Sequence, residues 1–321
     1  MMELGGAEIA GIKMHAAIDV IMRRNHIHHC TMGIWCDWEA QGTRLTQNLL
    51  HDNQRPAFAK QLKGGMMCQD IFVEVGHGPT LIDNNILLSD ASLRFATQGV
   101  AMVHNLICGA LTCVGDGTGW RYTPYHMPHR TEVRGFMTIL HGDDRFYNNI
   151  FVQKWPSEDF IIMHDSDDGF DSENRKVGTW MFDEYPTYDE WISQFDFTKP
   201  ADMKKLEPVH FDHLPVWSEG NVYLNGAKAW KHEKNGLVSS ENVKVELTEK
   251  DGKYILDTNI YEILGDFSGR MINTEVLGKA FEPEEFFENP DGTPITFDAD
   301  YFGGHRGAKV IPGPFAAKED A

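Results

Sequence analysis

Two apolar segments of strand length, each carrying one carboxylate, stand out in the alternation of hydrophobic and polar positions. The first reads GIWCDWE (33–39) and the second DIFVEV (70–75). Side chains alternate between the two faces of a β-strand, so the aliphatic residues of each segment would face a core. The opposite face would then present an aromatic residue followed by an acid, which is Asp37 in the first segment and Glu74 in the second.

An asparagine followed by apolar residues recurs along the first half of the chain. The positions are Asn25, Asn48, Asn85, Asn105 and Asn149. Their intervals of 23, 37, 20 and 44 residues fit one period of about 22, with an insertion in the second interval and two periods in the fourth. Such a short repeat, rich in β-branched and aromatic residues, is typical of a β-solenoid with one coil per repeat.

The two acids have the same place in this repeat, because Asp37 lies 11 residues before Asn48 and Glu74 lies 11 residues before Asn85. Stacked strands lie about 4.8 Å apart, so carboxylates in one column would be roughly 5 Å from each other. Retaining glycosidases hold their two carboxyl groups about 5 to 5.5 Å apart, whereas inverting enzymes need room for a water molecule. The spacing therefore favours a retaining glycosidase, with two solvated surface acids as the alternative.

Three segments resemble glycoside hydrolase family 120, the β-xylosidases: EIAGIKMHAAID (8–19), GIWCDWEAQGTR (33–44) and IFVEVGHGP (71–79). The similarity continues to 221–228 and 290–294. The resemblance implies that Asp37 is the nucleophile and Glu74 the acid/base. Members of the family are much longer at the N-terminus, so we expect that this chain lacks an N-terminal half.

Further candidates for sugar binding follow from these segments. The resemblance places polar sugar contacts near Glu8 and His15, and an aromatic–histidine run near residues 121–129 looks like the family. Trp35 offers a flat ring for stacking on a sugar, and His77 follows directly after the second acid. The candidate substrate-binding residues are Glu8, His15, Trp35, His77, Arg121, His126 and His129. Solvated or purely structural roles are the alternative for each of them.

Pattern and resemblance together predict an all-β protein. We expect a right-handed parallel β-helix (solenoid) with a C-terminal antiparallel β-rich module, in which DG turns at 251–252 and 291–292 join alternating strands over 243–258 and 273–302. Residues 1–152 would form the coils that carry the active site, 153–215 an acidic excursion, and 216–321 a last coil and the C-terminal module.

Composition narrows the class of ligand. The formal net charge of -19 disfavours nucleic acid and anionic membranes, and a neutral small oligosaccharide fits better. The start of the chain lacks the basic and apolar parts of a signal peptide, and the five cysteines have no zinc spacing. We therefore expect a cytoplasmic protein, and we expect a homo-oligomer, because the first coil would expose an open sheet edge.

No cofactor is expected for two-carboxylate hydrolysis, and no metal ligands are assigned. The histidines at 26, 28 and 29 alternate between strand faces and cannot converge on one ion without a bend. The acidic segment 165–173 resembles a calcium loop, but its glycine stands at the fifth rather than the sixth position. A structural calcium ion is the only metal that the sequence leaves open.

Two other classes of function compete with the retaining β-xylosidase. One is a non-catalytic carbohydrate-binding or structural β-helix protein, a truncated homologue of the enzyme. The other is a polysaccharide lyase on the same fold, which would need basic residues for its acidic polymer and is disfavoured by the net charge of -19.

Overall fold

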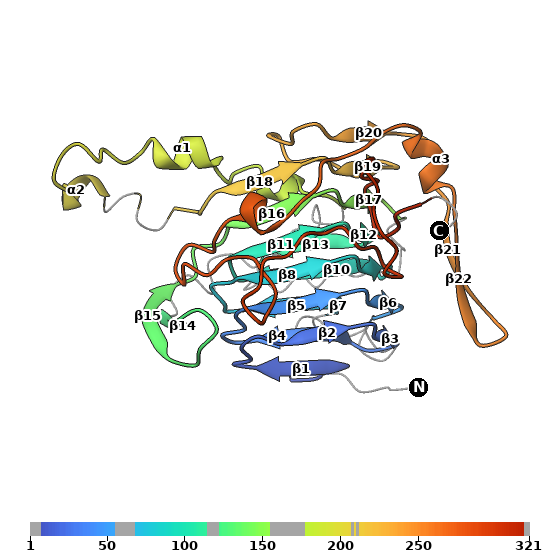
Figure 1. Cartoon of the computed structure of the whole chain (residues 1–321), viewed down its shortest axis with the longest axis horizontal. Coiled ribbons are helices and arrows are strands. Elements are labelled where there is room, and N and C mark those ends of the chain that lie inside the picture. The colour runs from blue at the N-terminus through green and yellow to red at the C-terminus, as the bar shows by residue number, and fades with distance from the viewer. Residues whose placement is uncertain are drawn as a thin grey trace, which may run out of the picture.

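The structure, a computed structural model, describes residues 8–54, 68–113, 122–154, 177–206, 209 and 212–317. Most strands in this part of the chain belong to three parallel sheets. Each pass of the chain adds one strand to each sheet in turn, so β1, β2 and β3 are followed by β4, β5 and β6. The strands are stacked from β1 at the bottom of Figure 1 to β20 at the top.

The first sheet contains β1 (Ile12–His15), β4 (Met32–Asp37), β7 (Gln69–Glu74), β10 (Ala91–Ala96) and β13 (Ala110–Cys113). The second sheet contains β2 (Ile21–Arg23), β5 (Thr43–Thr46), β8 (Thr80–Asp83), β11 (Val100–Val103), β16 (Asp144–Tyr147) and β18 (Val216–Glu219). The third sheet contains β3 (His26–His28), β6 (Leu49–His51), β9 (Ile86–Leu87), β12 (Leu106–Ile107), β17 (Ile150–Val152), β19 (Val222–Leu224) and β20 (Leu237–Ser239).

Two antiparallel hairpins and several short helices complete the described chain. The hairpins are β14 (Tyr122–His126) with β15 (Val133–Thr138), and β21 (Val245–Lys250) with β22 (Lys253–Thr258). The helices are the 3-10 helix η3 (Trp180–Phe182), α1 (Tyr188–Ile192), α2 (Met203–Leu206), α3 (Ile260–Leu264) and α4 (Thr274–Leu277). None of the helices in the described part of the chain combines the length and the apolar character needed to cross a membrane.

The main core is built from inward-facing aliphatic side chains of all three sheets. Each pass supplies one residue per sheet to a layer, as Ile71, Ile82 and Leu87 do for the third pass. In neighbouring layers aliphatic side chains lie beside aliphatic side chains, because parallel pairing sets Ile34 beside Ile71 and Leu45 beside Ile82. The apolar residues that alternate in the sequence thus form continuous columns inside the protein.

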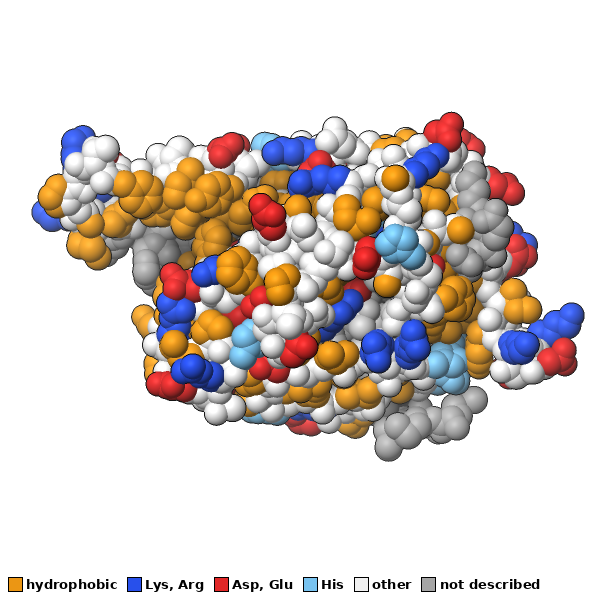
Figure 2. All heavy atoms as spheres, viewed as in Figure 1, with side chains coloured by type: hydrophobic (Ala, Val, Ile, Leu, Met, Phe, Trp, Pro, Cys, Tyr) orange, Lys and Arg blue, Asp and Glu red, His pale blue; other side chains and the backbone are white. Residues whose placement is uncertain are grey.

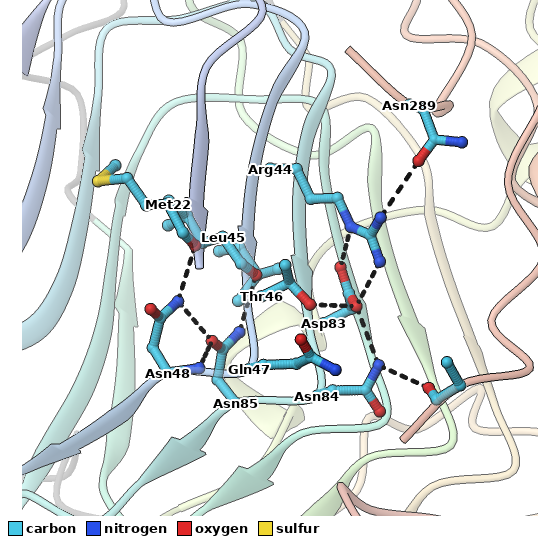
Figure 3. A network of polar contacts seen from close by, with 12 residues as sticks. Met22, Arg44, Leu45, Thr46, Gln47, Asn48, Asp83, Asn84, Asn85 and Asn289 are labelled. Atoms are coloured by element: carbon cyan, nitrogen blue, oxygen red, sulfur yellow. Dashed lines mark hydrogen bonds and ion pairs between the residues drawn. The ribbon is translucent and has the colours of Figure 1, made fainter. Parts of the chain in front are cut away.

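A ladder of asparagine side chains runs through the corner between the second and third sheets. From Asn48 onwards, each asparagine Oδ1 accepts hydrogen bonds of 2.9–3.0 Å from the backbone N–H and the side-chain amide of the asparagine one pass earlier. Its members are Asn25, Asn48, Asn85, Asn105, Asn149 and Asn221. Part of the ladder is seen in Figure 3, where Asn48 and Asn85 also donate to the carbonyls of Met22 and Leu45. The asparagine repeat in the sequence therefore shows which residues pair between neighbouring strands.

The C-terminal segment returns along the outside of the second sheet. Its Ile272, Phe287 and Phe297 pack with Leu81 and Val103 in a second buried cluster. Figure 3 shows the polar part of this contact, in which Arg44 pairs with Asp83 at 2.7 Å and donates to Asn289 Oδ1 at 3.2 Å.

The predicted fold class, a right-handed parallel β-helix with a C-terminal antiparallel β-rich module, is wrong in that form. The described strands form three stacks of parallel strands, and they do not define a right-handed solenoid. The asparagine and apolar repeat reports only which residues pair between neighbouring strands, and any stack of parallel strands satisfies it. Residues 273–302 form α4 and isolated bridges instead of alternating strands, although the DG turn at 251–252 does join β21 to β22.

Apolar side chains also gather on the surface around α1 and α2, at the upper left of Figure 2. The exposed ones are Tyr188, Phe197 and Met203. The acidic excursion predicted at 153–215 includes these helices, and its residues 155–176, with the calcium-like segment 165–173, lie outside the described residues. The division into three parts stays a prediction.

We expect Asn105→Ala to lower the free energy of unfolding by about 2 to 4 kcal/mol, because it leaves buried partners on both sides of the ladder unpaired. Asn105 is fully buried and bonds both Asn85 and Asn149. The matched variant Asn25→Ala, at the half-buried end of the ladder, should lose about 1 kcal/mol or less. Urea unfolding monitored by circular dichroism measures the free energy of unfolding of both variants. Equal losses would contradict the view that the interior hydrogen bonds of the ladder stabilise the protein more than those at its end.

Candidate active site

The outer face of the first sheet carries two columns of polar and aromatic side chains. Parallel pairing sets Lys13, Trp35, Phe72 and Arg94 side by side, one from each of β1, β4, β7 and β10. The next outward column begins with His15 beside Asp37. Glu74 lies in the same column, since Cys36 pairs with Val73 and each acid follows one position later. The predicted alternation of aromatic and acid on one face is confirmed for both strands.

Trp35 links the aromatic column to the second acid. Its indole Nε1–H donates to Glu74 Oε2 at 3.0 Å, and its ring lies 5.3 Å from that of Phe72, centroid to centroid. Both rings are almost completely buried. The hydrogen bond therefore orients the Glu74 carboxylate from a side chain that cannot easily turn.

Lys13 supplies the positive charge beside the first acid. Its Nζ lies 2.7 Å from Asp37 Oδ2 and 4.0 Å from the centroid of the Trp35 ring, and it also pairs with the Glu8 carboxylate. Asp37 itself is only 8% exposed. The site thus holds an ion-paired aspartate and a second carboxyl group on adjacent strands.

Lys13 and Arg94 also belong to this face, and neither is among the predicted site residues. Arg94 lies with its guanidinium 5.3 Å from the centroid of the Phe72 ring. The sequence spacing could have placed Lys13 on this face, because Lys13 stands two residues before His15, as Trp35 stands two residues before Asp37. For Arg94 the position on this face follows from the strand pairing, which sets it beside Phe72.

The predicted ligand His77 contacts the β14–β15 hairpin. Its Nε2 lies 3.1 Å from the Thr123 carbonyl and its Nδ1 3.2 Å from Gln98 Nε2. Burial lowers the pKa of His77 to about 4, so the ring is neutral at pH 7. Both ring nitrogens are engaged by protein atoms, which describes a residue that holds the hairpin against the sheets.

His126 and His129 lie at the tip of the same hairpin. His126 faces one acid, and His129 lies between two others. His126 Nε2 is 3.5 Å from Glu39 Oε2, and the backbone of His126 is bound on both sides by the Gln41 amide. His129 lies between Asp19 and Glu288, with its ring nitrogens 3.0 and 3.3 Å from their carboxylates.

The structure thus brings Glu8, His15 and Trp35 to the strands that carry Asp37 and Glu74. It places His77, His126 and His129 in contacts that bind the hairpin to other segments. Arg121 lies outside the described residues. The catalytic and binding roles of all these residues stay predictions.

No family model and no curated protein matches the sequence. Among solved structures, the chain is similar to XylC in its complex with xylose, with 34% sequence identity and a TM-score of 0.78. The match covers 97% of this chain and 43% of XylC, so the chain spans less than half the length of that protein.

The chain thus combines stacked parallel strands and two aligned carboxylates beside aromatic rings with a similarity to XylC that extends over nearly its whole length. This similarity agrees with the resemblance to glycoside hydrolase family 120 that the sequence predicted.

His77 provides a test of the contacts that position the hairpin. In the unfolded chain a histidine takes up a proton near pH 6.5, whereas the folded chain keeps His77 neutral down to about pH 4. The stability that His77 contributes is therefore present above pH 6.5 and is lost as the pH falls towards 4. Relative to His77→Gln, the wild-type chain should lose about 1.4 kcal/mol per pH unit in this window.

Urea unfolding between pH 4.5 and 7.5 measures this difference. The control is His305→Gln, which replaces a histidine whose side chain is 77% exposed. The control should follow the wild-type pH dependence. A His77→Gln curve parallel to the wild type would show that the ring is not buried against Thr123 and Gln98.

Proposed function

We propose that the chain carries the active site of a retaining β-xylosidase that releases xylose from short xylo-oligosaccharides. The observation that carries the proposal is the place of Asp37 and Glu74 at equivalent positions of adjacent strands, β4 and β7. Adjacent strands lie about 4.8 Å apart, which suits the separation of about 5 to 5.5 Å in retaining enzymes. The xylose in the XylC complex supports a xylose-containing substrate.

Asp37 attacks the anomeric carbon in this proposal, and it forms a covalent glycosyl-enzyme. Its ion pair with Lys13 fixes one oxygen, Oδ2, at 2.7 Å from the ammonium group. The other oxygen, Oδ1, is then the one that reacts with the sugar. A nucleophile held in one orientation needs less reorganisation to reach the anomeric carbon.

Glu74 first donates a proton to the leaving oxygen and then activates the water that hydrolyses the intermediate. The indole N–H of Trp35 donates to Glu74 Oε2 and orients the carboxyl group for this transfer. Two carboxyl groups complete this cycle, and the reaction needs no cofactor. The net charge of -19 suits a neutral oligosaccharide rather than an acidic polymer.

The first test is hydrolysis of xylobiose and of aryl β-xylosides by Asp37→Asn and Glu74→Ala. Asp37→Asn should lower kcat by at least about a thousandfold on both substrates, because the nucleophile is lost. Glu74→Ala should abolish xylobiose hydrolysis, yet azide should restore turnover of an activated aryl xyloside, with a β-xylosyl azide as product. Azide needs no general base, so it can resolve the glycosyl-enzyme without Glu74.

The matched control is Glu246→Gln, on the exposed hairpin β21–β22, which should leave kcat unchanged. An α-xylosyl azide from Glu74→Ala would contradict the retaining mechanism. A wild-type chain that binds xylose in calorimetry but hydrolyses no glycoside would instead identify the non-catalytic carbohydrate-binding protein.

A further inference from the structure

Three ligand-type side chains from distant parts of the sequence meet beside the β14–β15 hairpin. They are Asp19, between β1 and β2, His129, at the hairpin tip, and Glu285, in the C-terminal segment. One ligand atom from each lies within 4.8 Å of the others. His129 Nδ1 is 3.0 Å from Asp19 Oδ1. Two ligands that are each about 2.1 Å from one ion lie roughly 3 to 3.5 Å apart, so this separation suits two ligands of the same cation.

An unpaired buried oxygen points into this cluster. Glu285 is 1% exposed, and its Oε1 has no hydrogen-bond partner. The other oxygen, Oε2, accepts a hydrogen bond of 2.6 Å from Gln41 Nε2. A buried carboxylate oxygen without a partner is costly, particularly beside a second carboxylate. A cation bound between Glu285 and Asp19 would remove that cost.

Gly42 provides the room for such an ion. Its φ is +64°, and a Cβ atom there would meet both Asp19 Oδ1 and Glu285 Oε1. Because Gly42 has no side chain, the space beside both Asp19 Oδ1 and Glu285 Oε1 is left open. Any larger residue would need to displace them.

The surrounding contacts also match those of a metal site. Ligating histidines usually donate their second ring N–H to a carboxylate, which fixes the tautomer. His129 Nε2 lies 3.3 Å from Glu288 Oε1, so Nε2 can carry the proton and Nδ1 can bind an ion. Gln41 orients Glu285 in the same way.

We propose that Asp19, His129 and Glu285 bind one divalent transition-metal cation, Zn²⁺ or Mn²⁺, which fastens the hairpin tip and the C-terminal segment to the first pass of the chain. The imidazole ligand favours these ions over Ca²⁺ and Mg²⁺, which prefer oxygen ligands alone. His129 then serves as a metal ligand and not as a sugar contact. None of the three ligands is Asp37 or Glu74, so the proposal does not depend on the proposed hydrolase activity.

The experiment is a titration of the EDTA-treated, dialysed full chain with ZnCl₂ and separately with MnCl₂, followed by calorimetry and by thermal unfolding. Zn²⁺ has a second place to bind, because His26 and His51 lie with their Nε2 atoms 2.7 Å apart in a surface histidine group. His51→Gln therefore serves as the control for that group. Glu285→Gln and His129→Gln each remove one proposed ligand, and Glu285→Gln keeps an oxygen for the Gln41 contact.

We expect the His51→Gln chain to bind one equivalent of Zn²⁺ or Mn²⁺ and to unfold at a higher temperature with the ion than without it. In that background Glu285→Gln and His129→Gln should each weaken binding at least tenfold and abolish the shift in unfolding temperature. If one variant fails to fold, the other gives the answer. Loss of all binding in His51→Gln alone, or unchanged affinity in the two ligand variants, would overturn the proposal.

Discussion

The asparagine ladder is the interaction on which the rest of this structure depends. Its interior members are fully buried, and each side-chain amide bonds the pass before it and the pass after it. A slip of one residue would turn every alternating side chain to the opposite face and would leave these amides unpaired. The ladder therefore ties each strand to one register. At its upper end Glu233 takes the place of a further asparagine and accepts the backbone N–H of Asn221 at 3.0 Å.

The candidate active site follows from that register. Asp37 and Glu74 lie 11 residues before ladder positions 48 and 85, so fixing the two asparagines aligns the two acids. The preceding outward column then places Lys13 by Asp37, and Trp35 by Glu74. Asp37 is thus ion-paired with an ammonium group, and Glu74 accepts a hydrogen bond from an indole N–H. In the proposed mechanism the first carboxyl group is the nucleophile and the second is the acid/base.

Local patterns in the sequence were sufficient for the strands of the first sheet and for the common register of the two acids. Alternation over a few residues reports which face a side chain takes, and the spacing of Asn48 and Asn85 reports which residues pair. The same patterns could not define how the sheets are connected, and they failed at residues 273–302. That segment buries Ile272, Phe287 and Phe297 against the second sheet without forming a sheet of its own. Apolar residues spaced for such contacts look like an alternating strand in the sequence.

Contacts between distant segments account for the remaining differences. Nothing near His77 in the sequence shows that its ring bonds the carbonyl of Thr123, 46 residues later. The cluster of Asp19, His129 and Glu285 joins three segments that have no common repeat. Such groups are brought together by the hairpin and by the returning C-terminal segment, whose paths only the folded chain defines (Figure 1).

Trapping the covalent intermediate tests the central claim, that the ladder register sets Asp37 beside Glu74 as the nucleophile of a retaining glycosidase. A 2-deoxy-2-fluoro-β-xyloside with a good leaving group forms the glycosyl-enzyme and slows its hydrolysis, so mass spectrometry of the digested chain can locate the sugar. We predict one fluoroxylosyl group on the peptide that contains Asp37, and none in Asp37→Asn. A label on another residue, or no label in a chain that hydrolyses aryl xylosides, would contradict the account.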